Sequence, residues 1–148
     1  MANPYMALAI EEARAGIRAG HGGPFGCVIV KDGAVVGRGH NEVIHRKDPT
    51  CHGEIMAIHQ ACRELGTHDL SGCDLYTTAE PCPMCRGAIL WANIRKVYFG
   101  CTVSDTDGIG FRDRKFYEGT FDIEHESDRA ACLEVFREYQ AIRDKQAY

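Results

Sequence analysis

The first part of the chain carries apolar side chains at the spacing of an amphipathic helix. They recur every three or four positions: Tyr5, Leu8, Ala9, Ala13 and Ile17. This period predicts a helix over residues 5–17. The glycine-rich run 20–23 favours an end to the helix there.

Two β-rich runs follow, FGCVIV and AVVGRGHN, separated by the short sequence KDG. Asp32 and Gly33 are residues that tight turns favour, so residues 25–41 predict a β-hairpin. Beyond it, apolar residues again lie on one helical face: Ile55, Ile58, Cys62 and Leu65. A second helix is therefore expected from Glu54, with Gly66 as its C-terminal stop.

Strand and helix signals alternate in the middle of the chain. CDLYTT (73–78) predicts a strand, PMCRGAILWA (83–92) a short helix with Pro83 in its first turn, and KVYFGC (96–101) another strand. The glycine-containing segment 102–119 is expected to be a loop, and TFDIE (120–124) one more strand.

The last element is a helix whose apolar positions are again spaced by three or four: Cys132, Val135, Phe136, Tyr139 and Ile142. No internal repeat or linker separates these elements. We therefore expect one domain, residues 1–148, with helices on both faces of a mixed sheet. A chain of 148 residues is long enough to bury a core without disulfides.

Composition and charge narrow the function classes. Glu11 and Glu12 interrupt the apolar N-terminal run, which argues against a signal peptide or a membrane span. We expect a cytoplasmic protein whose eight irregularly spaced cysteines are mostly reduced. The net charge of −4 and the absence of a basic run do not favour a nucleic-acid partner.

Cys82 and Cys85 form the strongest chemical signal, because two thiols three residues apart at a helix start can reach one metal ion. Alone, the pair also fits a redox couple or two packing cysteines. His52 enters a predicted helix in the same way. Together the three side chains make a ligand set that suits zinc and leaves a fourth position open.

Glu54 follows His52 by two residues, where its carboxylate can stand beside the metal without binding it. Zinc lowers the pKa of bound water to about 7, and a nearby carboxylate can carry the released proton. His-x-Glu with Pro-Cys-x-x-Cys is the signature of zinc nucleobase deaminases, here HGE and PCPMC. A closed structural site with Cys51 as fourth ligand is the alternative, disfavoured because successive residues entering a helix point apart.

At this point the chain resembles the cytidine deaminase-like superfamily, and within it the bacterial-type guanine deaminases. The resemblance rests on GGPFGCVIVKDG, DPTCHGEIMAI, LYTTAEPCPMCRGAILWA and DTDGIGFRD. It implies a three-layer α/β/α sandwich around a five-stranded mixed sheet. It also implies one catalytic zinc ion per subunit and a free nucleobase as substrate.

The resemblance further implies substrate contacts at five positions. Asn41 would hydrogen-bond the base, and Phe25 and Trp91 would form walls for a planar ring. Gly53 would offer its backbone N–H, and Glu80 its backbone carbonyl to the leaving amine. Asn41 also has an ordinary reading as a turn residue, Phe25 and Trp91 as core aromatics, and Glu80 as a loop charge.

Asp113 in GFRD matches an acidic residue that guanine deaminases direct at the purine and its exocyclic nitrogen. The terminal Tyr148 matches an aromatic residue that closes the pocket, often that of a neighbouring subunit. The resemblance therefore implies a homodimer in which the C-terminal helix is exchanged. Without it, Asp113 would be read as a solvated charge and Tyr148 as a frayed terminus.

Three other functions stay open. HGE, with Gly53 where many guanine deaminases have alanine, also occurs in fungal-type cytosine deaminases, so an aminopyrimidine is an alternative substrate. tRNA adenosine deaminases share the EPCxMC region, but they resemble the chain poorly after Gly100 and usually present a basic surface. A structural zinc module is the third alternative, and it would leave Glu54 without a purpose.

Overall fold

The chain folds into two units, residues 1–118 and 119–148, in a computed structural model that describes residues 3–119 and 123–148. The first unit contains the whole described sheet. The second contains α7 (Arg129–Gln140), which confirms the predicted last helix.

The described sheet is mixed and has the strand order β2-β1-β3-β4. Its strands are β1 (Gly26–Lys31), β2 (Ala34–His40), β3 (Cys73–Ala79) and β4 (Lys96–Cys101). β1 pairs antiparallel with both β2 and β3, whereas β3 and β4 run parallel. The parallel pair requires a crossover, which α4 (Pro83–Trp91) provides.

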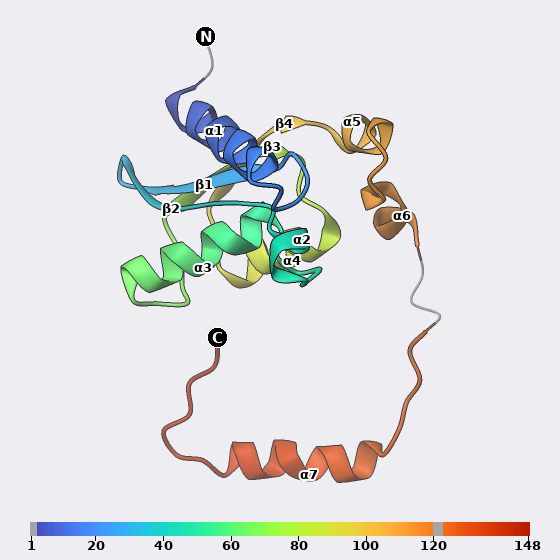
Figure 1. The fold of residues 1–148 in the computed structure, drawn as a ribbon. Coiled ribbons are helices and arrows are strands. Elements are labelled where there is room, and N and C mark those ends of the chain that lie inside the picture. Colours follow the sequence, from blue (N-terminus) through green and yellow to red (C-terminus); the bar gives the residue numbers. More distant parts are fainter. Residues whose placement is uncertain (1–2, 120–122) are drawn as a thin grey trace. The chain divides into compact units, whose positions relative to one another are not determined.

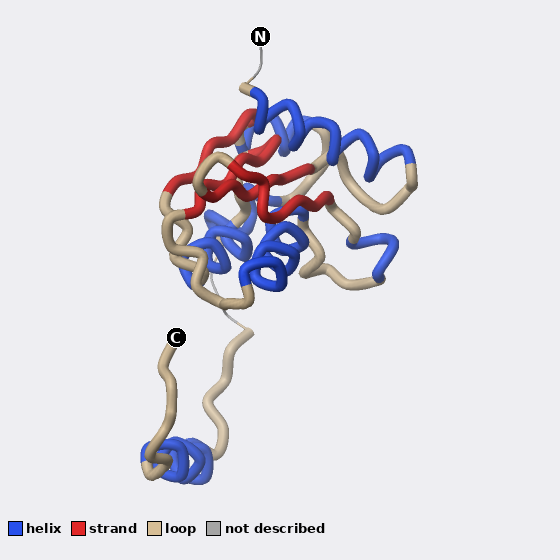
Figure 2. The backbone as a smooth tube through the Cα atoms, turned by 90° about the vertical axis from the view of Figure 1, so that its left-hand side faces the viewer, coloured by secondary structure: helices blue, strands red, loops and turns tan. Residues whose placement is uncertain are grey.

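Helices cover both faces of the sheet, as the sequence predicts. α1 (Pro4–Arg18) lies on one face, and α3 (Gly53–Leu65) lies with α4 on the other (Figure 1, Figure 2). The core under α3 and α4 consists of small and aliphatic side chains: Cys27, Ile29, Ala57, Ala61, Leu70, Cys73, Leu75, Ile89 and Ala92.

The residues predicted to form a turn and to end a helix do so in the structure. Asp32 and Gly33 adopt left-handed backbone conformations, with φ of 49° and 78°, and close the β1–β2 hairpin. Gly66 ends α3 in the same region of backbone space, with φ of 65°. The hairpin turn places the start of β1 beside the end of β2, because Gly26 pairs with His40, and α3 begins near these two residues.

Two expectations are corrected. The five-stranded sheet is wrong for residues 3–119 and 123–148, which form four strands. The predicted loop 102–119 contains two short helices, α5 (Val103–Gly108) and α6 (Asp113–Glu118). α5 begins because Thr102 and Asp105 form a capping box that satisfies the first amides of the helix. A further short helix, α2 (Val43–Arg46), was also not predicted.

The strand predicted over 120–124 falls mainly outside the described residues, which resume at Ile123 in a turn. None of the helices within residues 3–119 and 123–148 combines the length and the apolar character that crossing a bilayer requires.

Candidate metal centre and base pocket

Three potential metal ligands meet at the N-termini of two helices. His52 is the N-cap residue of α3, and Cys82 is the N-cap residue of α4. Both have the extended backbone that is usual at an N-cap, with ψ of 160° and 167°, and neither side chain makes a capping hydrogen bond to its own helix. Cys85 lies in the first turn of α4, and the three ligand atoms lie within 4.8 Å of one another.

The protonation states of the three side chains suit the binding of a metal cation. Cys82 Sγ lies 3.5 Å from His52 Nδ1, and a hydrogen bond from the Cys85 thiol is the main cause that lowers the pKa of Cys82 to about 4. Cys82 is therefore a thiolate at neutral pH. The thiolate in turn raises the pKa of His52 and that of Cys85. One imidazole and two sulfurs, with room for a fourth ligand, fit zinc.

Glu54 lies in the first turn of α3 next to these ligands, and only 6% of its surface is exposed. Burial raises the pKa of its carboxyl, and the negative Cys82 adds to the increase. A carboxyl whose pKa is moved toward neutrality both accepts and donates a proton readily. The position and the protonation behaviour of Glu54 both suit a proton carrier.

A cavity of about 480 Å³ opens over the metal ligands, which is the size range of small-molecule sites. Its walls are mainly apolar, with a few polar groups among them. Seven of the residues predicted from the sequence line it: Phe25, Asn41, His52, Glu54, Glu80, Cys82 and Asp113.

Asn41 is held in the cavity wall by its backbone and by its side chain. Its N–H donates to the carbonyl of Phe25 at 2.9 Å, and its Oδ1 accepts from the N–H of Val43 at 3.1 Å. This bond anchors the side-chain oxygen, and the NH₂ group gives Asn41 two donors for a ligand. Gly22 allows this packing, because a Cβ there would come within 2.1 Å of Asn41 Oδ1.

Asp113 begins α6 and brings a second carboxyl to the cavity. Its pKa is raised by burial and by the nearby Cys82. Phe111 also lines the cavity and packs edge to face on Phe25, with ring centroids 4.9 Å apart. The sequence pattern does not predict this role; the signal that could have indicated it is the position of Phe111 in GFRD, two residues before Asp113.

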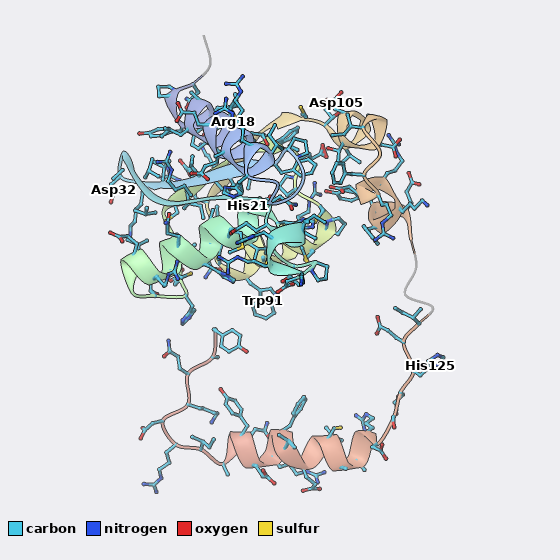
Figure 3. The ribbon with its side chains drawn as sticks, viewed as in Figure 1. Arg18, His21, Asp32, Trp91, Asp105 and His125 are labelled. Atoms are coloured by element: carbon cyan, nitrogen blue, oxygen red, sulfur yellow. The ribbon has the colours of Figure 1, made fainter. Side chains whose placement is uncertain are left out.

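Three predicted substrate contacts lie outside the cavity lining. Trp91 ends α4, projects outward from the first unit and is 68% exposed (Figure 3). Tyr148 belongs to the second unit and is 86% exposed. Gly53 lies between two lining residues, and a Cβ there would meet the carbonyl oxygen of Phe25 at 3.3 Å. The roles of all three stay predictions.

Cys51 does not belong to the ligand group, which among the described residues comprises His52, Cys82 and Cys85. Its backbone instead ties the preceding loop together, because its carbonyl accepts from the N–H of Glu42 at 2.9 Å. Within residues 3–119 and 123–148, the arrangement is therefore a three-ligand site beneath a cavity, as in catalytic zinc centres, without the fourth protein ligand of a structural site.

The comparisons with known proteins agree with this geometry. Residues 2–101 match the family described as the cytidine and deoxycytidylate deaminase zinc-binding region. A guanine deaminase from Bacillus subtilis is 46% identical over 114 residues, 77% of this chain and 73% of the relative. A tRNA-specific adenosine deaminase from Aquifex aeolicus is 41% identical over 105 residues, 71% and 69% of the two chains.

Solved structures point the same way. The crystal structure of the Bacillus subtilis guanine deaminase matches with a TM-score of 0.92 and 38% identity, covering 99% of both chains. A structure of guanine deaminase from Nitrosomonas europaea matches with a TM-score of 0.71 and 29% identity over 96% of this chain and 87% of that one. A structure of a tRNA:A34 deaminase matches with a TM-score of 0.64 and 44% identity, and the match covers 66% of this chain and 70% of that one.

Proposed function

The chain belongs to the family of the cytidine and deoxycytidylate deaminase zinc-binding region, and on that premise we propose that it hydrolyses guanine to xanthine and ammonia in the cytoplasm. The observation that carries the proposal is the buried Glu54 beside three zinc-type ligands at the floor of a small-molecule cavity. A structural zinc site would not need a cavity or a buried carboxyl next to it.

His52, Cys82 and Cys85 would hold one zinc ion per subunit. When bound there, zinc supplies a Lewis acid that makes water a nucleophile at neutral pH. Glu54 takes a proton from the attacking water and delivers it to ring N3, while the new C–O bond forms at C2. Glu54 then takes the proton of the new C2 hydroxyl and passes it to the exocyclic nitrogen; the C–N bond breaks as the C2 carbonyl forms, and ammonia leaves.

The other groups of the cavity orient the base. Asn41 offers NH₂ protons to acceptors on the ring, and Phe25 with Phe111 forms an aromatic wall against which a planar base can pack. Asp113 and the carbonyl of Glu80 accept from the amine that becomes the leaving group. An acidic, partly aromatic cavity suits a base that carries an amino group and ring N–H groups.

Guanine is favoured over the alternative substrates because the similarity to guanine deaminases extends over more of the chain. The Bacillus subtilis guanine deaminase structure covers 99% of this chain, whereas the tRNA:A34 deaminase structure covers 66%. The sequence similarity to tRNA-specific adenosine deaminases keeps tRNA as the second candidate. The net charge of −4 counts against it, because a polyanion is bound through basic surface.

The experiment is ammonia release by the zinc-loaded protein from guanine, cytosine and unmodified tRNA in parallel, with Glu54→Gln protein as the background control. We expect turnover of guanine. Turnover of cytosine or tRNA in its place would move the substrate to one of the alternatives. Full zinc occupancy without ammonia from any of the three would overturn the proposed function.

We also propose that the active form is a homodimer with an exchanged C-terminal segment. Within the second unit, α7 presents Val135, Phe136 and Tyr139 with 60%, 68% and 46% of their surfaces exposed. A helix with such a stripe is stable in water only when another surface covers it. In this proposal, Tyr148 of one chain closes the pocket of the other.

A further inference from the structure

A second group of metal-binding side chains lies outside the base pocket. His21 follows α1, His40 ends β2, and Glu42 precedes α2. One ligand atom from each lies within 4.8 Å of the other two. His40 and Glu42 are two residues apart, whereas His21 comes from the loop after α1, so the fold has brought His21 to the other two (His21 in Figure 3).

A hydrogen bond to Glu12 orients the ring of His40. His40 Nδ1 lies 3.0 Å from Glu12 Oε2, and because a carboxylate only accepts, Nδ1 carries the proton. In the neutral ring of His40, Nε2 is then the acceptor, and it faces His21 Nδ1 at a distance of 2.8 Å. A carboxylate that orients the far nitrogen of an imidazole is the usual outer support of a metal-binding histidine.

Backbone hydrogen bonds and close packing hold the two imidazoles, of His21 and His40, in place. The N–H groups of Ile44 and His45 both donate to the carbonyl of His21 at 3.0 Å, which ties the loop after α1 to α2. Gly16 leaves room for the His40 ring, because a Cβ there would come within 2.7 Å of it. The ring of His45 stacks on His21 with centroids 4.2 Å apart.

We propose that His21 Nδ1, His40 Nε2 and a carboxylate oxygen of Glu42 bind a second divalent transition-metal ion, such as zinc. Two imidazole nitrogens and one carboxylate form a set that zinc, nickel(II) and copper(II) accept. Tetrahedral zinc places two nitrogens about 3.4 Å apart. The pair must therefore open by roughly half an ångström from its 2.8 Å separation, and the proton that the two nitrogens share is released to water when the ion binds.

The solvent exposure of the three side chains and the ion pairs around them allow the two imidazoles to move apart and an ion to enter. The three side chains are 15–25% exposed, so an ion can enter from solvent. Glu42 Oε1 lies 3.9 Å from His21 Nδ1, while Oε2 pairs with Arg46 at 3.2 Å. The Arg46 side chain is 52% exposed and can turn outward when the ion takes its place. Glu12 keeps its own partner, Arg38.

The position gives the second ion a consequence for the pocket. Asn41 lies between two of the proposed ligands in sequence, and its side chain lines the cavity. An ion that joins His40 to Glu42 would restrain the backbone that carries Asn41. The proposal does not rest on which base the enzyme deaminates.

The test is zinc stoichiometry of the full chain, measured by equilibrium dialysis and atomic emission. Wild-type protein should bind two zinc ions per chain, and both His21→Gln and Glu42→Gln should bind one. His45→Gln is the matched control, because it removes a neighbouring imidazole without removing a ligand, and it should keep two. Cys82→Ala should lose the ion of the base pocket and keep the second.

Wild-type protein that stays at one zinc ion per chain as free zinc is raised would overturn the proposal, and the two imidazoles would then share a proton only. Equal loss in His45→Gln and His21→Gln would overturn the ligand assignment. Circular dichroism of each variant identifies one that fails to fold. If one of His21→Gln and Glu42→Gln fails to fold, the zinc stoichiometry of the other decides the test.

Discussion

At the scale of single residues, Glu54 combines a structural cost with a chemical role. A carboxyl that is 6% exposed is costly to ionise, and burial accordingly raises its pKa. Glutamine at this position would have nearly the same shape and would carry no charge. Selection for stability alone would not favour a glutamate there, so its presence argues for proton transfer.

Glu54→Gln should therefore keep zinc and lose turnover. We expect kcat to fall by about 100- to 10,000-fold, the range typical of a lost general acid or base. Ammonia release and zinc content measured on the same preparation check this. Glu64→Gln, an exposed position on the same helix, is the control and should keep full activity. An active Glu54→Gln enzyme would contradict the role of Glu54.

The residues of the site differ in how far the sequence predicts them. His52, Cys82 and Cys85 are predictable because each lies where a helix begins, and a spacing of three residues within one turn is a local property. Phe111 contacts Phe25 through folding of distant segments, and no local spacing reveals that. Trp91 fits the helical pattern equally well facing the pocket or solvent, and here it is exposed.

At the scale of elements, glycines in β1 and β2 set how closely the helices approach the sheet. A Cβ on Gly37 would lie 2.4 Å from the carbonyl oxygen of Ala57 and 2.9 Å from the amide nitrogen of Ala61. These are backbone atoms of α3, so the whole helix would have to move. Because α3 begins at the metal centre, its distance from the sheet also positions the site.

Gly37→Ala should destabilise the protein by about 1–3 kcal/mol, the usual cost of overpacking a core. Denaturant unfolding of the zinc-free proteins measures this without a contribution from metal binding. Gly87→Ala is the matched control: Gly87 lies within α4 with open space around its Cβ position. It should raise stability by about 0.5–1 kcal/mol, because alanine favours a helix. A neutral Gly37→Ala would show that α3 can shift freely.

An ion pair links the two parallel strands at their N-terminal ends. Arg95 donates to Asp74 through Nε at 3.0 Å and Nη2 at 2.8 Å, and these bonds lower the pKa of Asp74. A lowered pKa in the folded state means that the pair contributes stability above the ordinary pKa of Asp. That contribution is lost as the pH falls through the lowered value.

Asp74→Asn should therefore lower the thermal midpoint at pH 7, and the difference from wild type should narrow as the pH falls below about 4. Thermal unfolding across this range checks the sign. Asp144→Asn, an exposed carboxyl in the second unit, controls for general charge effects. A difference that grows toward acid pH would be inconsistent with the ion pair.

The elements that the sequence predicts are those with a continuous apolar pattern. α1, α3 and the four strands carry such patterns, and turn residues mark where they end. α5 and α6 are short, and glycines lie close to both, so periodicity does not reveal them. The Thr102–Asp105 capping box was the available signal for α5, because it identifies a helix start without any apolar repeat.

At the scale of the whole molecule, both units expose apolar side chains. In the first unit, Leu90 and Trp91 at the end of α4 are 71% and 68% exposed. In the second, α7 exposes Phe136 beside Val135 and Tyr139. Isolated exposed apolar residues are ordinary, but three on one face of a helix mark a surface that another surface covers.

The intact protein should therefore have twice the mass of one chain by light scattering, and Phe136→Asp should shift it toward one chain. A charge in the stripe would have to be buried without a partner on dimer formation, which is costly. Ala130→Asp is the matched control, because it adds the same charge in the first turn of α7, away from the stripe. It should stay dimeric.

Activity measurements on these variants test whether the dimer also completes the pocket. If Tyr148 of a partner chain closes the site, Phe136→Asp should raise KM for the base, and Tyr148→Ala should do the same while the mass stays that of a dimer. A dimer in which Tyr148→Ala leaves KM unchanged would separate assembly from catalysis. A monomeric wild-type protein with full activity would overturn the exchange altogether and leave each first unit complete by itself.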